Sequence, residues 1–311
     1  MTTRVFIDGA AGTTGLEIRD RLAGRSEFEL LVLDDAQRKS EAARKDALHA
    51  ADVAILCLPD DAAREAVALA EGSNTRFIDA STAHRVADGW TYGFPELIGR
   101  DRIAEAQFVS NPGCYPTGFL ALVGPLVRSG LLPADWPYTV NAVSGYSGGG
   151  KALIERFEAD TNIAFRAYGL GLDHKHLPEM QKYAGLSLAP VFSPSVVPGH
   201  RGMVVDVPLP LEAMNVLQDC SAQTAIQSCW YETYRDSSII MISDAPESGE
   251  ILLSRDAAPW DGMQLFAFVE ANGAQARLIA KLDNLGKGAS GAAIQNLNIM
   301  CSLPETLGLA L

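Results

Sequence analysis

Cys114 is the residue of this sequence best placed to act as a nucleophile. It lies in Ser110–Thr117 (SNPGCYPT), between an apolar run at 107–109 that is typical of a strand and an apolar pattern at 118–127 that is typical of a helix. A thiol at a helix N-terminus faces free backbone N–H groups and the positive end of the dipole, so we expect a lowered pKa and a raised thiolate fraction. Pro116 suits the first turn, where its missing N–H costs nothing. The sequence predicts a reactive cysteine, and a buried inert thiol is the alternative.

His200 is the candidate for acid–base chemistry. It stands beside Arg201 in Pro198–Gly202 (PGHRG), between two expected strands, and the glycines on both sides place the pair on a tight exposed turn. Imidazole exchanges protons near neutral pH, and a guanidinium can clamp an anionic oxygen with two hydrogen bonds. The pattern therefore predicts an acid–base residue next to an anion-binding residue, with a solvated turn as the alternative.

A glycine-rich loop follows the first expected strand. The order is a strand at 4–8, the loop Gly9–Gly15 (GAAGTTG) and a helix at 16–22, which is the context of a dinucleotide-binding loop. Glycines let the backbone approach a pyrophosphate, and the helix N-terminus accepts its charge. A plain turn is the alternative, because the spacing is G-x-x-G-x-x-G. The residues that we assign to cofactor binding here are Gly9, Gly12, Thr13, Thr14 and Gly15.

Acidic and basic residues follow the second expected strand. Asp34 and Asp35 lie about 20 residues beyond the loop, where an acid would bind the ribose of NAD. Arg38 and Lys39 come directly afterwards and could instead bind the 2′-phosphate of NADP. The residues leave the choice between NAD and NADP open, and a solvated loop is a further alternative.

The stretch Gly145–Lys151 nearly matches a phosphate-binding P-loop. A strand precedes it and a helix is expected after it, but Ala152 stands where a Ser or Thr must hold magnesium. The sequence therefore favours a glycine-rich substrate loop over a nucleoside triphosphatase, with a flexible turn as the alternative.

His174 and His176 have the spacing of two strand histidines that share a metal ion. Only Glu179 is a clear further ligand nearby, so we expect no metal site. We expect these histidines to be structural or to line the substrate pocket.

The elements that must position these residues alternate in the first part of the chain. Strands are expected at 4–8, 29–35, 51–58, 76–81 and 108–109, with helices at 16–22 and 62–70. Such alternation predicts a parallel sheet with right-handed crossovers. Because ligands bind at the carboxyl ends of parallel strands, Gly9, Pro59, Ser81 and Cys114 should share one crevice.

The second part of the chain has longer strands. They are expected at 138–143, 190–197, 202–207, 239–243, 263–271 and 276–282, with one long helix over Glu212–Tyr234. This pattern predicts an α+β domain on a mixed or antiparallel sheet, whose sheet could form a symmetric interface. A last helix over Lys287–Met300 could return to the first domain.

Composition narrows the class of partner and compartment. The 311 residues carry a formal net charge of −13, which argues against nucleic acid and anionic membrane surfaces. Five widely spaced cysteines without C-x-x-C indicate neither a disulfide framework nor a zinc site. The chain enters a strand without a signal peptide and holds no run of membrane-helix length, so we expect a cytoplasmic protein.

Several stretches, in this order along the chain, resemble the N-acetyl-gamma-glutamyl-phosphate reductases of arginine biosynthesis, specifically the short form of that family. The cysteine stretch and the last one are specific, and the glycine loop is not. The stretches are Gly9–Gly15, Asp79–Arg85, Asn111–Thr117, Ser144–Gly148, His174–Glu179, Pro198–Gly202 and Asp283–Gly291.

The resemblance implies an α/β protein with two domains. The first, 1–113, would be a Rossmann domain that binds NADP, with a C-terminal helix at 285–311 packed onto it. The second, 114–284, would be an α+β catalytic and dimerisation domain like that of glyceraldehyde-3-phosphate and aspartate-semialdehyde dehydrogenases. A homo-oligomer, dimer or tetramer, is expected.

The resemblance also implies roles for single residues. Cys114 would be the nucleophile and His200 the acid–base, and Arg201 and Arg85 would bind the substrate's phosphate or carboxylate. Further substrate contacts are expected at Asn111, Ser144 and Gly145, and further cofactor contacts at Arg38, Ser81 and, near the nicotinamide, Asn284.

The implied reaction is the NADPH-dependent reduction of N-acetyl-gamma-glutamyl phosphate to N-acetylglutamate 5-semialdehyde. Thiolate attack would expel phosphate and leave a thioester, which accepts hydride more readily than a carboxylate does. A dehydrogenase for aspartate semialdehyde or an aminoadipate derivative is one alternative. A non-catalytic NADP-sensing protein is another.

Overall fold

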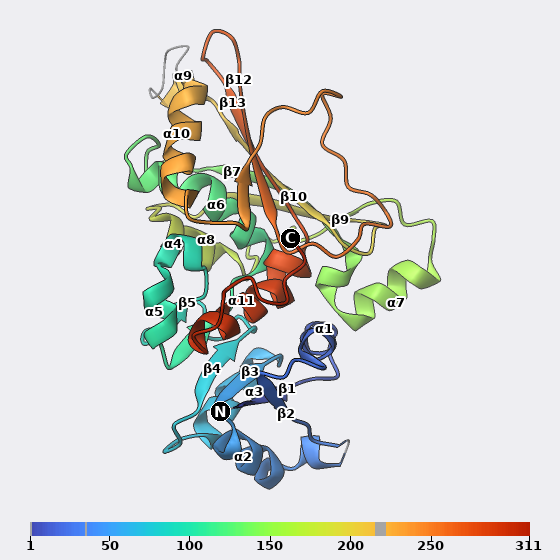
Figure 1. The fold of residues 1–311 in the computed structure, drawn as a ribbon. Coiled ribbons are helices and arrows are strands. Elements are labelled where there is room, and N and C mark those ends of the chain that lie inside the picture. The colour runs from blue at the N-terminus through green and yellow to red at the C-terminus, as the bar shows by residue number, and fades with distance from the viewer. Residues whose placement is uncertain (1, 35, 215–221) are drawn as a thin grey trace. The chain divides into compact units, whose positions relative to one another are not determined.

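The computed structural model describes residues 2–34, 36–214 and 222–311. Its residues form two compact units, Met1–Gly113 with Ala289–Leu309 and Cys114–Gly288 with Ala310–Leu311 (Figure 1). The chain thus crosses between the units at 113–114, at 288–289 and at 309–310, whereas the sequence places the second domain limit at 284–285. No helix within the described residues has the length and apolar character needed to cross a membrane.

Within the described residues, six strands of the first unit form one parallel sheet in the order β2-β1-β3-β4-β6-β5. Its elements are β1 (Thr3–Asp8), α1 (Thr13–Leu22), β2 (Phe28–Leu31), the 3₁₀ turn η1 (Gln37–Lys39), α2 (Glu41–Ala50), β3 (Val53–Leu56), α3 (Asp60–Leu69), β4 (Arg76–Asp79), β5 (Thr91–Tyr92), α4 (Pro95–Ile98), α5 (Arg100–Glu105), β6 (Phe108–Ser110) and α11 (Gly291–Met300).

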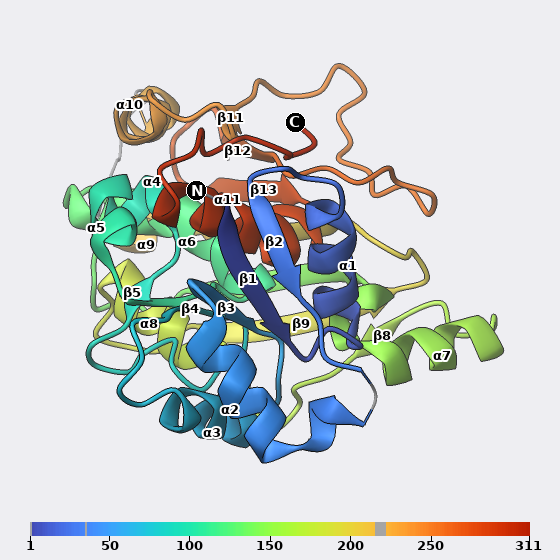
Figure 2. The same ribbon diagram turned by 60° about the horizontal axis from the view of Figure 1, so that its bottom comes forward.

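Helices cover both faces of this sheet because successive strand residues point to opposite sides. Phe6 of β1 packs in a cluster with α2 and α3, which lie together in front of the sheet in Figure 2. Val5 and Ile7 pack on the other face in a cluster with α1, α5 and α11. Ile294 and Leu297 of α11 belong to this second cluster, so the C-terminal helix is part of the first unit's core.

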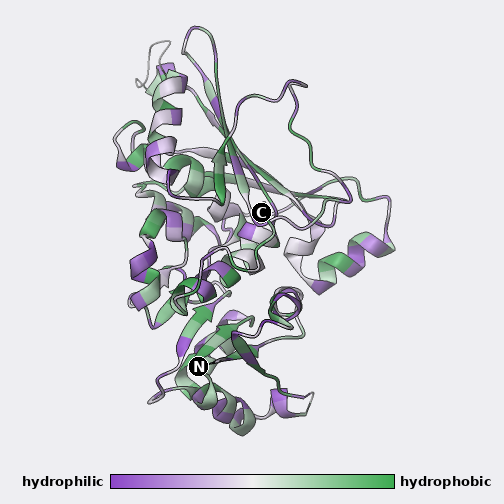
Figure 3. Cartoon of the chain, viewed as in Figure 1, coloured by the Kyte–Doolittle hydropathy of each residue, from purple (hydrophilic) through white to green (hydrophobic). Residues whose placement is uncertain are grey.

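The second unit is built on a mixed sheet with the order β11-β12-β13-β10-β7-β9-β8 among the described residues. Helix α7 carries both hydrophilic and hydrophobic residues (Figure 3). The elements are α6 (Cys114–Arg128), β7 (Thr139–Gly145), the 3₁₀ turn η2 (Tyr146–Gly149), α7 (Lys151–Ala159), β8 (Arg166–Ala167), α8 (Leu177–Ala184), β9 (Val191–Val197), β10 (Met203–Leu209), α9 (Leu211–Met214), α10 (Ala222–Tyr234), β11 (Ile240–Ile242), β12 (Met263–Val269), β13 (Ala276–Leu282) and the π-helical turn η3 (Gly286–Ser290).

The helix α6 is buried along most of its length, from Tyr115 to Leu126. Pro125 lies inside it and has no N–H, so the carbonyl of Ala121 loses its helical partner. The hydroxyl of Tyr234, on α10, donates a hydrogen bond to that carbonyl over 2.8 Å. A neighbouring helix therefore replaces the bond that the proline removes.

Several predicted elements differ from the observed ones. The strand expected at 29–35 ends at Leu31, because the Asp34 carboxylate accepts the backbone N–H groups of Ala36 and Gln37 and turns the chain into η1. The strand expected at 76–81 ends at Asp79, whose carboxylate accepts the N–H of Ser81.

Further findings concern helices and the histidine pair. The helix expected over Glu212–Tyr234 is found at its ends as α9 and α10, and residues 215–221, with Cys220, lie outside the described residues, as does Asp35. His174 and His176 precede α8, where a proline at the start of the helix favours helix initiation. Helix α2, for which no prediction was made, begins at the N-cap Ser40, whose hydroxyl accepts the N–H of Ala43.

Candidate active site

The glycine loop of the first unit lines a cavity of about 630 Å³. Gly9 has φ of +87°, and an added Cβ would lie 2.2 Å from the carbonyl oxygen of Cys57. A Cβ on Gly15 would lie 2.5 Å from the oxygen of Gly9. The two glycines are therefore required for the backbone path, and Gly12 and Arg38 also line the cavity. Thr13 and Thr14 form the first turn of α1.

Basic residues from three segments face this cavity. Arg19 of α1, Arg38 and Lys39 of η1, and Arg44 of α2 are among its lining residues. Asp34 is not among these lining residues. Its carboxylate instead caps the turn η1, which carries Arg38. The cavity can hold an anionic dinucleotide, with the glycine loop and α1 at one end and these cations along its wall.

Asp8 sits beneath the loop in a buried ion pair. Its carboxylate accepts bonds from Nε and Nη2 of Arg44, both at 3.0 Å. Burial raises the pKa of Asp8, and the hydrogen bond from Arg44 opposes that rise. Arg44 also donates to Glu65 of α3, so the pair ties α2 and α3 to the end of β1.

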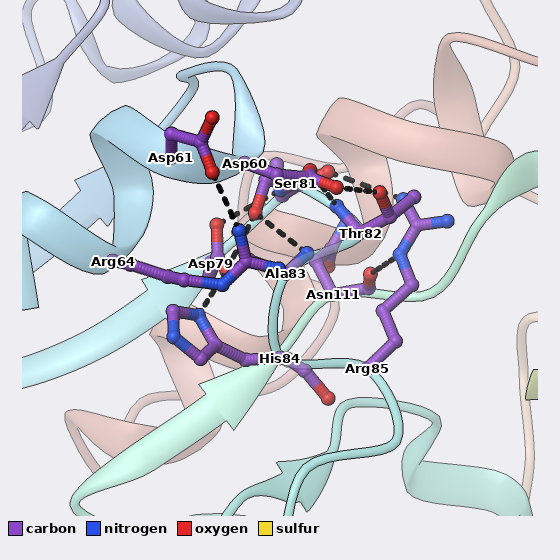
Figure 4. A network of polar contacts seen from close by, with 12 residues as sticks. Asp60, Asp61, Arg64, Asp79, Ser81, Thr82, Ala83, His84, Arg85 and Asn111 are labelled. Carbon is purple, nitrogen blue, oxygen red and sulfur yellow. Dashed lines mark hydrogen bonds and ion pairs between the residues drawn. The ribbon is translucent and has the colours of Figure 1, made fainter. Parts of the chain in front are cut away.

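A polar network surrounds the end of β4 (Figure 4). The fully buried carboxylate of Asp79 accepts the hydroxyl of Ser81 over 2.8 Å and contacts Nδ1 of His84 over 2.6 Å. The His84 ring stacks on Trp90 with centroids 4.1 Å apart. Ser81, expected to bind cofactor, is thus held by β4 at the carboxyl edge of the sheet.

Arg85 and Asn111 are buried in the same unit. Nε of Arg85 donates to the carbonyl of Asn111 and Nη2 donates to that of Ala80, both over 3.1 Å. We expected both residues to contact substrate. Nε and Nη2 of Arg85 are instead bonded to backbone carbonyls.

In the second unit, Cys114 is the first residue of α6, as predicted, and Pro116 lies in the first turn. The backbone of η3 passes directly against it: a Cβ on Gly288 would lie 2.9 Å from the Cβ of Cys114. The N–H of Gly288 donates to the carbonyl of Asp283 over 3.0 Å, which fixes this approach. Only glycine at 288 permits it.

Three strand ends meet in the second unit. Strand β7 pairs with both β9 and β10, so its end lies against the 198–202 turn that joins them. A Cβ on Gly145 would lie 2.7 Å from the carbonyl oxygen of His200, and Ser144 is buried beside it. Since Met203 of β10 faces Leu282 of β13, the residues after β13 reach the same turn.

Polar contacts join these strand ends. Nη1 of Arg201 and the carboxylate of Asp283 form an ion pair at 2.9 Å, with 11% and 4% of the side chains exposed. Asn284 accepts the N–H of Gly202 and donates to the hydroxyl of Ser147, both at 2.9 Å. Contacts within the second unit thus fix the side chains of Asn284 and Arg201. The centroid of the His200 ring lies 5.5 Å from that of the Tyr146 ring, in an edge-on arrangement.

Two tyrosines near Cys114 have no counterpart in the sequence prediction. Burial raises the pKa of Tyr115, and raises that of Tyr168 to about 12, while the charge of Cys114 adds to both shifts. The Tyr115 ring lies 6.3 and 6.0 Å from those of His174 and His176. In the sequence, the position of Tyr115 directly after Cys114 was the signal that could have predicted this tyrosine environment.

The predicted residues therefore fall into two groups. The second unit holds Cys114, Ser144, Gly145, His200, Arg201 and Asn284, and the first holds Gly9, Gly12, Thr13, Thr14, Gly15, Arg38, Ser81, Arg85 and Asn111. Within the described residues, no three His, Cys, Asp or Glu side chains are grouped to hold a metal ion.

Comparison with known proteins matches both parts of the chain to families. Residues 4–106 match the family described as semialdehyde dehydrogenase, NAD binding domain, and residues 114–284 match semialdehyde dehydrogenase, dimerisation domain.

Two relatives similar along nearly their whole length are named N-acetyl-gamma-glutamyl-phosphate reductase. The protein from Trichormus variabilis is 48% identical over 98% of this chain and 99% of its own. That from Brucella ovis is 50% identical over 96% of this chain and 99% of its own.

Solved structures of aspartate semialdehyde dehydrogenases share the fold. The Vibrio cholerae enzyme II, complexed with ASA, has a TM-score of 0.71 at 16% identity and covers 97% of this chain and 99% of its own. The Candida albicans enzyme with NADP has a TM-score of 0.65 at 14% identity, covering 96% and 98%.

Proposed function

We propose that this chain, which belongs to the N-acetyl-gamma-glutamyl-phosphate reductase family, reduces N-acetyl-gamma-glutamyl phosphate to N-acetylglutamate 5-semialdehyde with NADPH and releases phosphate. The chain is an oxidoreductase of the semialdehyde dehydrogenase type, with a dinucleotide-binding domain and a dimerisation domain. The setting of Cys114, at the start of α6 against the backbone of Gly288, is the structural observation that carries the proposal.

Cys114 is the proposed nucleophile. Its thiolate forms a C–S bond to the acyl carbon, and the bond from that carbon to the phosphate oxygen breaks, with the electron pair leaving on phosphate. NADPH, when bound, supplies the hydride that reduces the thioester carbonyl carbon. The resulting oxyanion re-forms a carbonyl as the C–S bond breaks, which releases the aldehyde and the Cys114 thiolate.

The reaction as a whole takes up one proton, which the departing phosphate accepts, and we propose a histidine as its donor. His200 is the first candidate, because its turn is fixed by the end of β7 and by Asn284. His174 and His176 are the second candidates, since their rings lie against Tyr115, the residue after the nucleophile.

The pH dependence of kcat/KM separates these candidates. Replacing the acid–base residue with Gln should lower kcat/KM about 10²–10⁴-fold and remove one limb of the profile. His200→Gln and His176→Gln are measured side by side with unchanged NADPH affinity as the check on folding. A retained limb in His200→Gln, with its loss in His176→Gln, would assign the role to the second candidate.

Arg201 is proposed to bind an anionic group of the substrate. Its ion pair with Asp283 holds the guanidinium plane in place, and Asp283 is itself fixed by the N–H of Leu285. Arg85, Asn111, Ser144 and Gly145 remain predicted substrate contacts. Ser81 and Asn284 remain predicted cofactor contacts.

NADP is the proposed cofactor of the 630 Å³ cavity. The glycine loop and α1 fit a pyrophosphate, and Arg38, with Lys39, would hold the 2′-phosphate. Asp34, one of the two acids that could bind the ribose of NAD, is engaged as a cap. Asp35, the other, lies outside the described residues. Gly9, Gly12, Thr13, Thr14 and Gly15 make up the pyrophosphate side of this proposal.

We further propose a homo-oligomer, dimer or tetramer, formed through the second unit, with no nucleic-acid or membrane partner. The net charge of −13 supports the latter point. A reducing compartment, the cytoplasm, is proposed because Cys57, Cys114, Cys229 and Cys301 are all thiols rather than disulfide halves.

One assay tests the proposed reaction. Phosphate-dependent reduction of NADP⁺ is measured with N-acetylglutamate semialdehyde and with aspartate semialdehyde. We expect the higher kcat/KM with N-acetylglutamate semialdehyde. Preference for the second would identify another semialdehyde dehydrogenase, and cofactor binding without turnover of either would identify a non-catalytic NADP-binding protein.

A further inference from the structure

Asn111 lies three residues before the proposed nucleophile, and all of its polar groups form hydrogen bonds. Its N–H donates to the carbonyl of Asp79 over 2.7 Å, and its carbonyl accepts Nε of Arg85 over 3.1 Å (Figure 4). Its side-chain Nδ2 donates to the carbonyl of Ala289 over 2.9 Å. Its Oδ1 accepts Nδ2 of Asn296 over 3.1 Å. The residue is 1% exposed, and these four hydrogen bonds fix its position.

Asn296 supplies one of these locks from the middle of α11. It is fully buried, and its Nδ2 also donates to the carbonyl of Gly93 over 3.0 Å. Its Oδ1 is buried and accepts no hydrogen bond from the residues that the structure describes. A buried oxygen without a donor is costly, but an apolar side chain here would cost more, because it would leave the Gly93 carbonyl and Oδ1 of Asn111 without their donor. The amide at position 296 is therefore tied directly to the position of Asn111.

The segment that follows Asn111 contains a proline and a glycine before Cys114. Pro112 has no N–H to donate, and Gly113 has the widest backbone freedom of any residue type. The Asn111–Ala289 bond and the approach of Gly288 to Cys114 join neighbouring residues of the same two chain segments. Loss of the anchor would therefore be transmitted directly to the position of the thiol.

We propose that Asn296 is a positioning residue for the reaction: through Asn111 it sets the place of the Asn-Pro-Gly-Cys turn and thereby of the Cys114 thiol. The inference rests on the proposed function in that Cys114 is taken as the nucleophile. A misplacement of about 1 Å at a reacting atom can cost about 10²-fold in rate, so one buried bond can matter for turnover.

Asn298 offers a matched control on the same helix. It is also fully buried, and its Nδ2 donates to two carbonyls, those of Glu305 and Leu307, while its Oδ1 accepts Nη2 of Arg25. Those bonds hold the C-terminal segment rather than Asn111. Asn296→Ala and Asn298→Ala should therefore lower the free energy of unfolding by similar amounts.

The two variants should differ in thiol chemistry. In Asn296→Ala we expect kcat to fall about tenfold or more, with KM for NADPH unchanged, and alkylation of Cys114 by iodoacetamide without substrate to slow. In Asn298→Ala both rates should stay near those of the parent. Adding Asn296→Ala to Asn111→Ala should have no further effect on either rate, because the two residues act through one bond.

Equal kcat values and equal alkylation rates in Asn296→Ala and Asn298→Ala would overturn the inference. If circular dichroism shows that Asn296→Ala does not fold, Asn296→Ser, which keeps one donor, replaces it in the same comparison. Alkylation needs neither cofactor nor acyl phosphate. A parent without turnover therefore contradicts the proposed function alone, while equal alkylation contradicts the positioning role alone.

Discussion

At the scale of single residues, the cysteines of this chain differ in their expected reactivity. Burial raises the pKa of the Cys57 thiol to about 12, with the carboxylates of Asp79 and Asp8 adding to the shift. Burial also raises the pKa of Cys301. Both thiols should remain protonated near neutral pH and react slowly, because the thiolate is the nucleophile. Iodoacetamide should therefore label Cys114 before either, as read by peptide mass spectrometry, and substrate should protect it.

Cys114→Ser tests the covalent step directly. The hydroxyl is nearly the size of the thiol but stays protonated, so activity should fall by orders of magnitude while NADPH affinity is retained. Cys301→Ser is the control and should keep most of the activity. Turnover by Cys114→Ser near the parent rate, or inactivation by a label that spares Cys114, would contradict the mechanism.

Arg201→Lys tests the anion contact. The substitution keeps the charge but loses the planar fork and its geometry against Asp283, so we expect a higher substrate KM or a lower kcat/KM. NADPH affinity should not change, and Arg277→Lys, in an ion pair with Asp206 whose arginine is exposed, is the matched control. Kinetics unchanged in Arg201→Lys would place the anion site elsewhere.

At the scale of elements, the support of α6 by α10 makes a prediction about stability. Tyr234→Phe removes the donor to the carbonyl that Pro125 leaves open, and that buried carbonyl then has lost its bond. We expect the free energy of unfolding to fall by about 1–3 kcal/mol in urea titration. Tyr231→Phe, on the same helix but 56% exposed, should change it by less than about 0.5 kcal/mol. Equal losses in both would show that the bond to Ala121 does not matter.

Local pattern was sufficient to predict elements whose periodicity and punctuation agree. The strand–glycine–helix order at β1 and α1, and the helix starting at Cys114, follow from apolar runs bounded by glycine and proline. The failures occur where a side chain overrides propensity. Asp34 ends one strand by capping a turn, and Asp79 ends another by accepting the N–H of Ser81. Neither override is visible without the partner that each side chain meets in space.

The candidate site shows the same contrast between local sequence pattern and contacts made in space. The helix start at Cys114 was predicted from its local context, because a turn and a helix start are encoded within a few residues. The tyrosine environment of Cys114 depends on Tyr168, and the anchoring of Asn111 depends on Asn296, which lie far away along the chain. Contacts of that separation leave no local signal in a single sequence.

At the scale of the whole molecule, charge should govern how the cofactor arrives. The net charge of −13 repels an anionic dinucleotide at long range, whereas Arg38 and Lys39 attract it at the cavity. The Debye length falls from about 30 Å at 0.01 M salt to about 8 Å at 0.15 M, so added salt screens the long-range repulsion first. We therefore expect the association rate constant of NADPH, measured by stopped-flow fluorescence, to rise over this range.

The dissociation rate constant should respond to the local cations instead. Arg38→Ala should speed dissociation of NADPH and leave that of NADH nearly unchanged, because only NADPH carries the 2′-phosphate. Arg64→Ala, an exposed cation of α3 paired with Asp61, changes the net charge equally and is the matched control.

An association rate that falls as salt is added would mean that the cations around the cavity, rather than the acidic surface, set the field that NADPH meets. Equal affinity of the parent chain for NADH and NADPH would remove Arg38 as the reader of the 2′-phosphate.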